Sequence, residues 1–215
     1  ARPQLSRLST KEWEKRKSKI NKRINELADR LISLYGNRVR NKGFAFPADD
    51  ELQKQFENEF PYQLTSDQQA AVDAIKKDME SNEIMDRLVC GDVGFGKTEV
   101  AFRAAFKAIS NGKQVALLCP TTLLARQHYE VAMQRFATFG VRLALFSRLI
   151  PDSVQNQNLK AIKEGKIDFI IGTHRLLSKD FEFKDLGLLI VDEEQRFGVE
   201  QKERIKEMKN SVDVL

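Results

Sequence analysis

The pattern of apolar and polar positions changes near residue 60. Beyond it, short apolar runs alternate with segments in which apolar residues recur every three or four positions. The runs predict strands, and the periodic segments between them predict helices. Strands that are apolar throughout and separated by helices are typical of a parallel sheet covered on both faces, so we expect an α/β fold. The predicted strands cover residues 88–90, 114–119, 141–147, 167–171 and 186–191, and residues 212–215 could begin a sixth.

The first part of the chain has a helical pattern instead. Ser9 and Glu12 form a capping-box pattern at which a helix can begin, and Gly36 is a residue at which it can end. Together these signals predict one helix of about 25 residues. A narrow apolar seam runs along it through Ile20, Ile24, Leu27, Leu31 and Leu34. We therefore expect three parts: a basic helical arm at 1–42, a linker at 43–59 with a short helix near its end, and the α/β lobe at 60–215.

Charge is distributed unevenly between these parts. The whole chain has a formal net charge of +5, but residues 1–42 hold 13 Lys and Arg against 4 Asp and Glu. The basic arm could meet nucleic-acid phosphates. Glutamates interrupt the positive charge, however, and this favours a solvated helix face whose apolar seam packs on the neighbouring lobe or a partner.

The cysteines and the lengths of the apolar runs indicate the cellular compartment of the protein. Cys90 and Cys119 each close an apolar run, so we expect two buried thiols in a reducing compartment rather than a disulfide. No run of about 18 or more apolar residues occurs, which predicts a cytoplasmic protein with no membrane partner. Both ends of the sequence look like cuts through a longer protein.

A glycine-rich stretch carries the first chemical motif. It follows the apolar run at 88–90, opens an alanine-rich helical pattern, and fits G-x-x-x-x-G-K-[ST], the phosphate-binding loop of nucleotide hydrolases. Its backbone N–H groups and the following helix N-terminus attract phosphate oxygens. The lysine would reach the β- and γ-phosphates, and the threonine hydroxyl would ligate Mg²⁺. The motif consists of Gly91, Asp92, Val93, Gly94, Phe95, Gly96, Lys97 and Thr98.

Two carboxylates after the apolar run at 186–191 form the second motif. Asp192 is the first residue past the expected strand, and Glu193 follows it. Hydrolysis of Mg-ATP needs one carboxylate to hold the metal and another group to orient the attacking water. We assign the first role to Asp192, which would ligate Mg²⁺ together with Thr98, and the second to Glu193.

Gln68 has two interpretations that the spacing leaves equally open. Thr65 and Gln68 fit a capping box at the start of a helix. Alternatively, Gln68 hydrogen-bonds an adenine edge while Phe60 covers the face of the base. The two histidines, His128 and His174, have no second ligand at metal spacing, so the sequence does not support a zinc site.

These motifs, in this order, resemble those of superfamily 2 helicases and translocases. Within that superfamily the chain is similar to two bacterial families, the RecG branch-migrating helicases and the transcription-repair coupling factors, and the second match is closer. The segments that carry the closer match include residues 5–8, 28–35, 43–46 and 185–195, whereas residues 91–94, 146–148 and 196–199 resemble both families. The resemblance implies a RecA-like lobe, the first of two, preceded by a long helix.

The resemblance also implies roles for individual residues. Phe60 and Gln68 would recognise adenine, Lys97 and Thr98 would hold the phosphates and Mg²⁺ of ATP, and Gln195 would sense the γ-phosphate beside Asp192 and Glu193. Such lobes track a DNA backbone with residues on several loops, through phosphate and sugar rather than bases. The matching positions here are Thr121, Thr122, Gln127, Ser147, Arg148, Thr173, His174 and Arg175. One departure is Leu149-Ile150-Pro151, where the family commonly has an aromatic and a second basic residue.

The implied function is an ATP-driven translocase on double-stranded DNA that acts on stalled RNA polymerase and works with excision-repair proteins. Three alternatives remain: a RecG-like lobe acting on branched DNA, a P-loop kinase, and a P-loop switch or interaction module. The second lobe, which supplies arginine fingers in this superfamily, is not in this sequence. We therefore expect the isolated chain to bind Mg-ATP weakly and to hydrolyse it very slowly.

Overall fold

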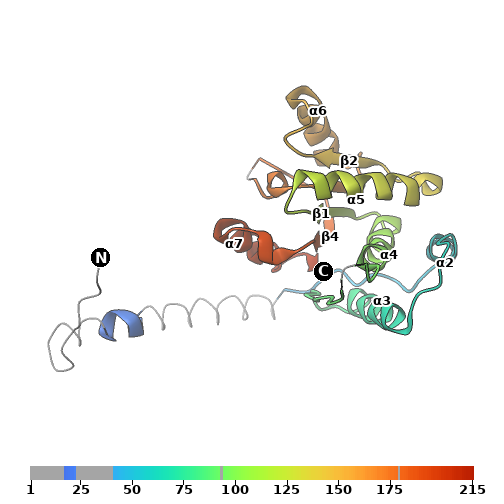
Figure 1. Cartoon of the computed structure of the whole chain (residues 1–215), viewed down its shortest axis with the longest axis horizontal. Helices are drawn as coiled ribbons and strands as arrows, with labels where there is room; N and C mark the ends of the chain where they lie inside the picture. Colours follow the sequence, from blue (N-terminus) through green and yellow to red (C-terminus); the bar gives the residue numbers. More distant parts are fainter. Residues whose placement is uncertain (1–16, 23–40, 93, 179) are drawn as a thin grey trace. The chain divides into compact units, whose positions relative to one another are not determined.

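The computed structural model describes residues 17–22, 41–92, 94–178 and 180–215 (Figure 1). The chain separates into two compact units, residues 1–40 and residues 41–215. In the first unit, residues 17–22 are helical and exposed to solvent. The rest of the expected arm helix, including its apolar seam beyond Ile20, lies outside the described residues.

The second unit is the α/β lobe. Its five strands are β1 (Gln114–Leu118), β2 (Leu143–Phe146), β3 (Phe169–Gly172), β4 (Leu186–Val191) and β5 (Asp213–Val214). Its α-helices are α2 (Glu51–Asn58), α3 (Ser66–Met79), α4 (Lys97–Ser110), α5 (Thr122–Arg135), α6 (Asp152–Lys163) and α7 (Val199–Met208). Short 3₁₀ helices are η1 (Ala137–Phe139), η2 (His174–Leu177) and η3 (Glu194–Arg196).

All described strand pairs are parallel, in the spatial order β2-β3-β1-β4-β5. Beyond β5 the sheet is extended by the segment that leads into the phosphate-binding loop. Val214 donates its N–H to the carbonyl of Met85, and Arg87 donates to the carbonyl of Val214. A single bridge between Asp86 and Val214 completes this contact. The loop therefore starts two strand positions away from β4.

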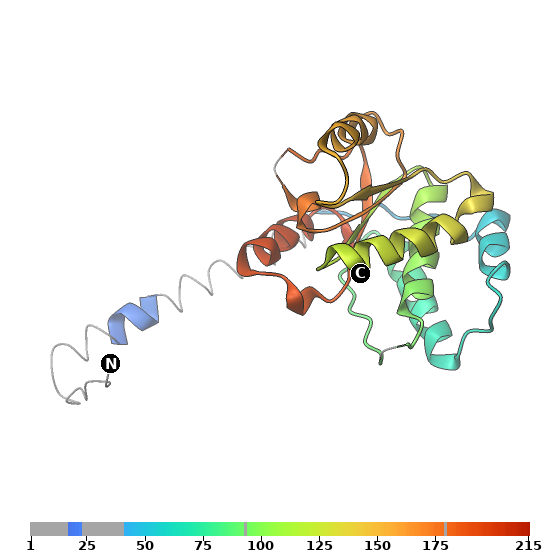
Figure 2. The ribbon, with the colours of Figure 1, turned by 45° about the horizontal axis from the view of Figure 1, so that its top comes forward.

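Alternate residues of each strand point to opposite faces of the sheet, and each face has its own core. Val115 and Leu117 of β1 belong to a cluster with residues of α3, α4 and α5. Ala116 and Leu118 belong to a second cluster, which includes Ile162 of α6 and Ile205 of α7. Helices α2 and α3 pack on α4 rather than on the sheet, and both views show them on the far side of α4 from the strands (Figures 1 and 2).

The expected parallel sheet with helices on both faces is confirmed, as is a short helix, α2, within residues 43–59. The expected strand at 88–90 is wrong. These residues belong to no strand, and the side chain of Leu88 is 82% exposed. The physical reason is that β5, on the side away from β4, pairs only with residues 85–87, so residues 88–90 have no neighbouring strand.

The expectation of two buried thiols holds for only one of them. Cys119 is fully buried at the end of β1, whereas Cys90 is exposed because it lies in the unpaired stretch; both are free thiols. Helix α7 was not expected from the sequence pattern. In the part of the chain that the structure describes, no helix is both long enough and apolar enough to cross a membrane.

Candidate functional site

The phosphate-binding loop ends at the N-terminus of α4. Gly96, the N-cap of this helix, has φ +76°, and Gly94 has φ +84°; both angles lie in the left-handed region that favours glycine. A Cβ atom on Gly96 would lie 2.6 Å from Nε2 of Gln68, so a larger residue there would also displace the Gln68 side chain. No side chain caps α4. Its first N–H groups therefore remain available to an anion.

Lys97 is the first residue of α4, and its side chain turns back over the loop. The Nζ atom donates to the carbonyl oxygens of Gly91 at 2.6 Å and Asp92 at 2.8 Å. A phosphate oxygen could replace these carbonyls as the acceptor because Lys has three donors and a full charge. Thr98 follows, partly buried, and Val93 lies outside the described residues.

The capping-box interpretation of Gln68 is confirmed, whereas its role in binding adenine stays a prediction. Its Oε1 atom accepts from the N–H of Thr65 at 2.8 Å while its own N–H donates to Thr65 Oγ1, which is a capping box. Its Nε2 atom donates to the carbonyl of Phe95 inside the phosphate-binding loop. The residue proposed to recognise adenine therefore joins the start of α3 to the loop.

Phe60 lies between α2 and α3, beside two arginines. The guanidinium carbons of Arg103 and Arg135 lie 5.9 Å and 5.7 Å from the centre of its ring, within cation–π distance. Tyr62 meets the same ring edge-on at 5.6 Å between centroids. The ring is partly exposed.

Asp192 follows β4 directly and is tied to the neighbouring strand. Its N–H donates to the carbonyl of Leu118 at the end of β1. Its Oδ2 atom lies 3.1 Å from Nε2 of His128, on α5. Sequence reasoning missed this contact because the two residues are 64 positions apart, and no local pattern links them.

Glu193 has φ +50°, which makes it the only non-glycine residue with positive φ in the described ranges. Strained backbone of this kind gathers at functional sites. Its Oε2 atom lies 2.6 Å from Nε of Arg196 as an ion pair, without the geometry of a directed hydrogen bond. Gln195 lies in η3 and is exposed.

Cys119 lies next to this carboxylate loop. Burial, and in second place the charge of Asp192, raises the pKa of its thiol far above the ordinary range. The thiol is therefore protonated at neutral pH, and since thiolate is the reactive and metal-binding form, Cys119 is neither a nucleophile nor a ligand here.

The eight residues matched to DNA-tracking positions follow three adjacent strands or, for Gln127, lie on α5. The loops after β1, β3 and β2 are joined by backbone hydrogen bonds from Cys119 to Gly172 and from Thr173 to Phe146. Thr121 caps α5, with its hydroxyl accepting from the N–H of Leu124, and Thr122 is the first residue of that helix. The exposed residues of the set are Thr121, Gln127, Arg148 and His174.

The other members of the set have partners within the lobe. The side chains of Ser147 and Thr173 are buried, at 2% and 4% exposure. Arg175 makes a bidentate ion pair with Asp180, at 2.7 Å and 2.6 Å, and also donates to Ser178. The Arg175 guanidinium holds the pKa of the Asp180 carboxyl well below its usual range.

The order of the strands separates the two sets of residues. The candidates for holding the phosphates and Mg²⁺ and for hydrolysis follow β4 or the segment 85–87, whereas most of the DNA candidates follow β1, β3 and β2. Phe60 and Gln68 lie before α3 and in its first turn. Ligands of open α/β sheets bind beyond the carboxyl ends of the strands, and both sets lie at that edge. The ends of β4 and of segment 85–87 are two strand spacings apart, about 10 Å. One triphosphate could bridge that span.

The residues present fit Mg²⁺ carried by a nucleotide rather than a metal held by the protein alone. Among the described residues, no group of three or more His, Cys, Asp or Glu side chains could hold a metal ion. Thr98 and Asp192 instead offer one hydroxyl and one carboxylate. Mg²⁺ prefers oxygen ligands, keeps several waters and takes the rest of its ligands from substrate phosphates.

Comparison with known proteins places the chain in a family. The family model for DEAD/DEAH box helicases matches residues 65–214, which include both motifs. The chain belongs to the DEAD/DEAH box helicase family. A solved structure described as RecG bound to a three-way DNA junction superposes with a TM-score of 0.74 and 35% identity, over 85% of this chain and 24% of that one. The lobe is thus a RecA-like helicase lobe.

Further relatives span the whole sequence. The transcription-repair-coupling factor of Bacillus subtilis (strain 168) is 55% identical over 213 residues, which is 99% of this chain and 18% of that protein. The factor of Borreliella burgdorferi is 54% identical over 98% of this chain and 19% of its own length. A hypothetical ATP-dependent RNA helicase from Sulfolobus tokodaii, at 18% identity and a TM-score of 0.57, shares the fold. The chain thus spans under a fifth of the length of these curated relatives.

Proposed function

We propose that this chain is the ATP-binding lobe of a double-stranded DNA translocase of the transcription-repair coupling type. One observation carries the proposal. The loop with Lys97 opens an uncapped α4 at the same edge of the sheet as the carboxylates that follow β4. A positive, donor-rich helix end facing two acidic residues is what hydrolysis of Mg-ATP requires.

Each nucleotide-site residue has a role in this proposal. Lys97 exchanges its two loop carbonyls for oxygens of the β- and γ-phosphates. Thr98 and Asp192 hold Mg²⁺, which when bound neutralises charge on the phosphates. Glu193 orients the attacking water and accepts its proton. Gln195, in the short helix η3 that follows, contacts the γ-phosphate.

The base would be held at the other end of the nucleotide. Gln68 can hydrogen-bond an adenine edge only if its Nε2 atom gives up the carbonyl of Phe95. Binding of the base therefore changes the conformation of the phosphate-binding loop directly. Phe60 offers its partly exposed ring to the face of the base.

DNA would lie along the loops after β1, β3 and β2. Thr121, Gln127, Arg148 and His174 are exposed and would contact phosphate and sugar, since a motor must pass over any base sequence. Thr122, at the first turn of α5, offers its N–H to the same backbone. Ser147 and Thr173 are buried, so they would hold these loops in place. Arg175 would face the DNA beside its ion-pair partner Asp180.

The partners of the whole protein follow from the names of its relatives. Transcription-repair-coupling factors at 55% and 54% identity support action on stalled RNA polymerase together with excision-repair proteins. We expect these partners to bind mainly outside this chain, because it spans only 18% and 19% of those relatives. The cytoplasm is the expected location, which two free thiols support.

The test is steady-state ATP hydrolysis by the chain extended through the second lobe that the proposal requires, with no DNA, with single strands and with linear duplex. We expect strong stimulation by duplex and its loss in Glu193→Gln. Equal rates under all three conditions would overturn the proposal in favour of a kinase or a P-loop switch. The 215-residue chain alone should turn over fewer than about one ATP per second, the low end of ordinary enzymes.

A second function is favoured by the structural match to RecG, which has 35% identity over most of the lobe. In that case the lobe would drive movement on branched DNA. The same assay distinguishes the two, because a branched-DNA helicase is stimulated by a three-way junction far more than by linear duplex of equal length. A translocase of the coupling type responds to both.

A further inference from the structure

Helix α4 carries more than the phosphate-binding lysine. Glu99, in its first turn, is only two residues from Lys97, yet its side chain is 6% exposed and points away from the loop into the protein. There it accepts from two arginines. Arg103 Nε donates to Oε1 at 2.9 Å, and Arg135 donates to Oε1 at 2.9 Å and to Oε2 at 3.0 Å.

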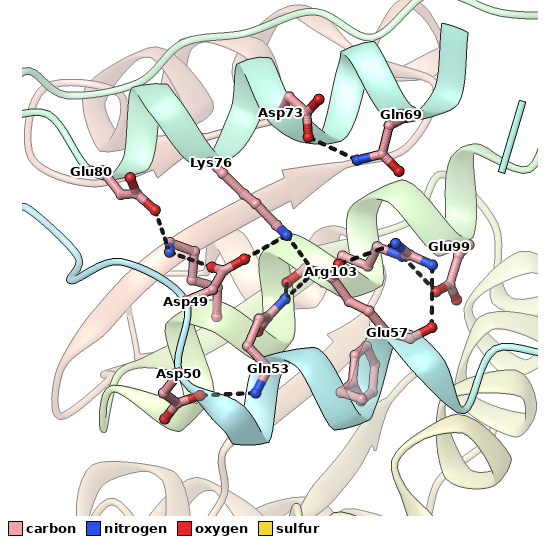
Figure 3. Close-up of polar contacts among 12 residues, drawn as sticks. Asp49, Asp50, Gln53, Glu57, Gln69, Asp73, Lys76, Glu80, Glu99 and Arg103 are labelled. Atoms are coloured by element: carbon pink, nitrogen blue, oxygen red, sulfur yellow. Dashed lines mark hydrogen bonds and ion pairs between the residues drawn. The ribbon is translucent and has the colours of Figure 1, made fainter. Parts of the chain in front are cut away.

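Both arginines continue toward the segment that holds Phe60. Arg103 reaches the carboxylate of Glu57 at 3.2 Å, and Figure 3 shows its guanidinium between Glu99 and Glu57. Arg135 donates to the carbonyl of Phe56 at 2.6 Å, with its guanidinium carbon 3.7 Å from the centre of the Phe56 ring. Glu99 thus fixes two cations, and the cations fix residues 56–60 from two sides.

The charges of this largely buried network balance. Four acids meet four bases, namely Asp49, Glu57, Glu80 and Glu99 with Lys76, Arg103, Lys107 and Arg135. Figure 3 shows the part that contains Asp49, Lys76, Glu57, Arg103 and Glu99. A balanced, hydrogen-bonded network holds each side chain in one geometry, and removing one member leaves its partners buried and unpaired. The network can therefore position a ring as well as join helices.

We propose that Glu99, Arg103 and Arg135 are positioning residues that hold the Phe60 ring at a fixed place relative to the phosphate-binding loop. The inference rests on the proposed function, since it requires that Phe60 receive a base. Both arginines lie within 6 Å of the Phe60 ring centre, and both are held by a carboxylate on the helix that also carries Lys97. One helix would thus set the positions of both ends of the nucleotide.

The experiment measures binding of Mg-ATP and of Mg-tripolyphosphate, which has no base, to the 215-residue chain by calorimetry. We expect Arg135→Gln to weaken ATP binding about tenfold and to leave tripolyphosphate binding unchanged within twofold. Stacking of a base on an aromatic ring raises affinity roughly five- to hundredfold. A Phe60 ring that is no longer held in place should lose part of this gain. Arg126→Gln, on the same helix but in an exposed pair with Glu130, should change neither.

A double-mutant cycle separates positioning from general stability. In a Phe60→Ala background there is no ring left to position, so adding Arg135→Gln should not weaken ATP binding further. A tenfold loss that persists in that background, or an equal loss for ATP and tripolyphosphate, overturns the inference.

A more conservative substitution tests the inference if the Arg135→Gln variant does not fold. Arg135→Lys keeps the charge but cannot bond both Glu99 oxygens and Phe56 at once. It should lose ATP affinity severalfold with tripolyphosphate binding intact, and full ATP affinity in this folded variant overturns the inference. Wild-type chain that binds neither ligand would overturn the proposed function itself.

Discussion

The imidazole of His128 and the carboxylate of Asp192 are in contact, with 3.1 Å between Nε2 and Oδ2. His128 belongs to α5, the helix that begins with Thr121 as its cap among the DNA candidates, whereas Asp192 follows β4 among the nucleotide candidates. The contact therefore links the DNA candidates to the nucleotide candidates at this edge of the sheet. It also restricts the orientation of a carboxylate that the proposal assigns to Mg²⁺.

The first prediction concerns this contact. His128→Ala removes the group that orients Asp192, and loss of such a partner typically costs about 10- to 100-fold in metal affinity or activity. In the two-lobe protein, the Mg²⁺ concentration for half-maximal ATP hydrolysis should rise about tenfold or more. Arg126→Gln, on the same helix as His128 but in an exposed pair with Glu130, is the matched control and should leave the Mg²⁺ titration unchanged. An unaltered titration in His128→Ala would mean that the contact has no part in metal binding.

Asp213 gives a prediction about stability and pH. Its Oδ1 atom accepts from the N–H of Met85 at 2.7 Å, just before the phosphate-binding loop, and the side chain is 5% exposed. Burial raises the pKa of Asp213 to about 6, helped by the charge of Asp78 and opposed by the Met85 N–H. The ordinary value is 3.8. Below both values the carboxyl is protonated in the folded and unfolded states, so it costs no stability there.

As the pH rises from about 4 through about 6, the unfolded state releases the Asp213 proton first. The free energy of unfolding should then fall by up to about 3 kcal/mol, from two pKa units at about 1.4 kcal/mol each. Asp213→Asn keeps an acceptor for Met85 but cannot ionise. Chemical denaturation from pH 4 to pH 7.5 should show the wild type losing stability relative to this variant. Parallel pH profiles would refute the prediction.

Lys107 gives a prediction about the buried network. Its side chain is 1% exposed, and Nζ donates to Asp49, Glu80 and the carbonyl of Pro47 at 2.7 to 2.8 Å. Lys107→Met keeps the stem but removes the cation from Glu80 and Pro47 and leaves Asp49 with Lys76 alone. Loss of a partner for buried acceptors typically costs about 1–3 kcal/mol. Urea denaturation should show a loss of that size. Lys163→Met, in an exposed pair with Glu182, should show none outside error.

The fold could be predicted from the sequence because the sheet is covered on both faces. The residues of β1 are all buried, so the strand stands out as an apolar run, and β4 stands out because its central residues are buried. Helix α7 gave no such signal. Ile205 is its one buried residue, and a single apolar anchor in a charged segment has no helical period.

The candidate site was also predictable from the sequence only in part. Lys97 and Asp192 could be found because each lies in a short local motif, the glycine-rich loop that opens α4 and the carboxylates that directly follow β4. The long-range contacts around these motifs could not be found in the sequence. His128 lies 64 positions from Asp192, and Arg135 lies 36 positions from Glu99. Only the packing of α5 against the sheet brings these pairs together, and pairing between distant polar residues leaves no periodic trace in one sequence.

The last prediction concerns Arg175, which faces DNA in the proposed function but is bound to Asp180 in this structure. The two N–H···O contacts of 2.7 Å and 2.6 Å occupy the guanidinium edge that a phosphate would need. Asp180→Asn removes the competing charge. It should therefore tighten binding of linear duplex by the two-lobe protein, and the logarithmic salt slope should steepen by about one unit for one added phosphate contact.

The matched substitution works in the opposite direction. Arg175→Gln should leave the wild-type salt slope unchanged if Asp180 holds Arg175 in the bound state, and should reduce it by about one unit if DNA displaces Asp180. Fluorescence anisotropy between 50 and 200 mM salt, roughly the range in which phosphate contacts dominate affinity, measures both variants. Asp180→Asn with unchanged affinity and slope would show that Arg175 does not face the DNA. Its ion pair would then serve only to shape the loop after β3.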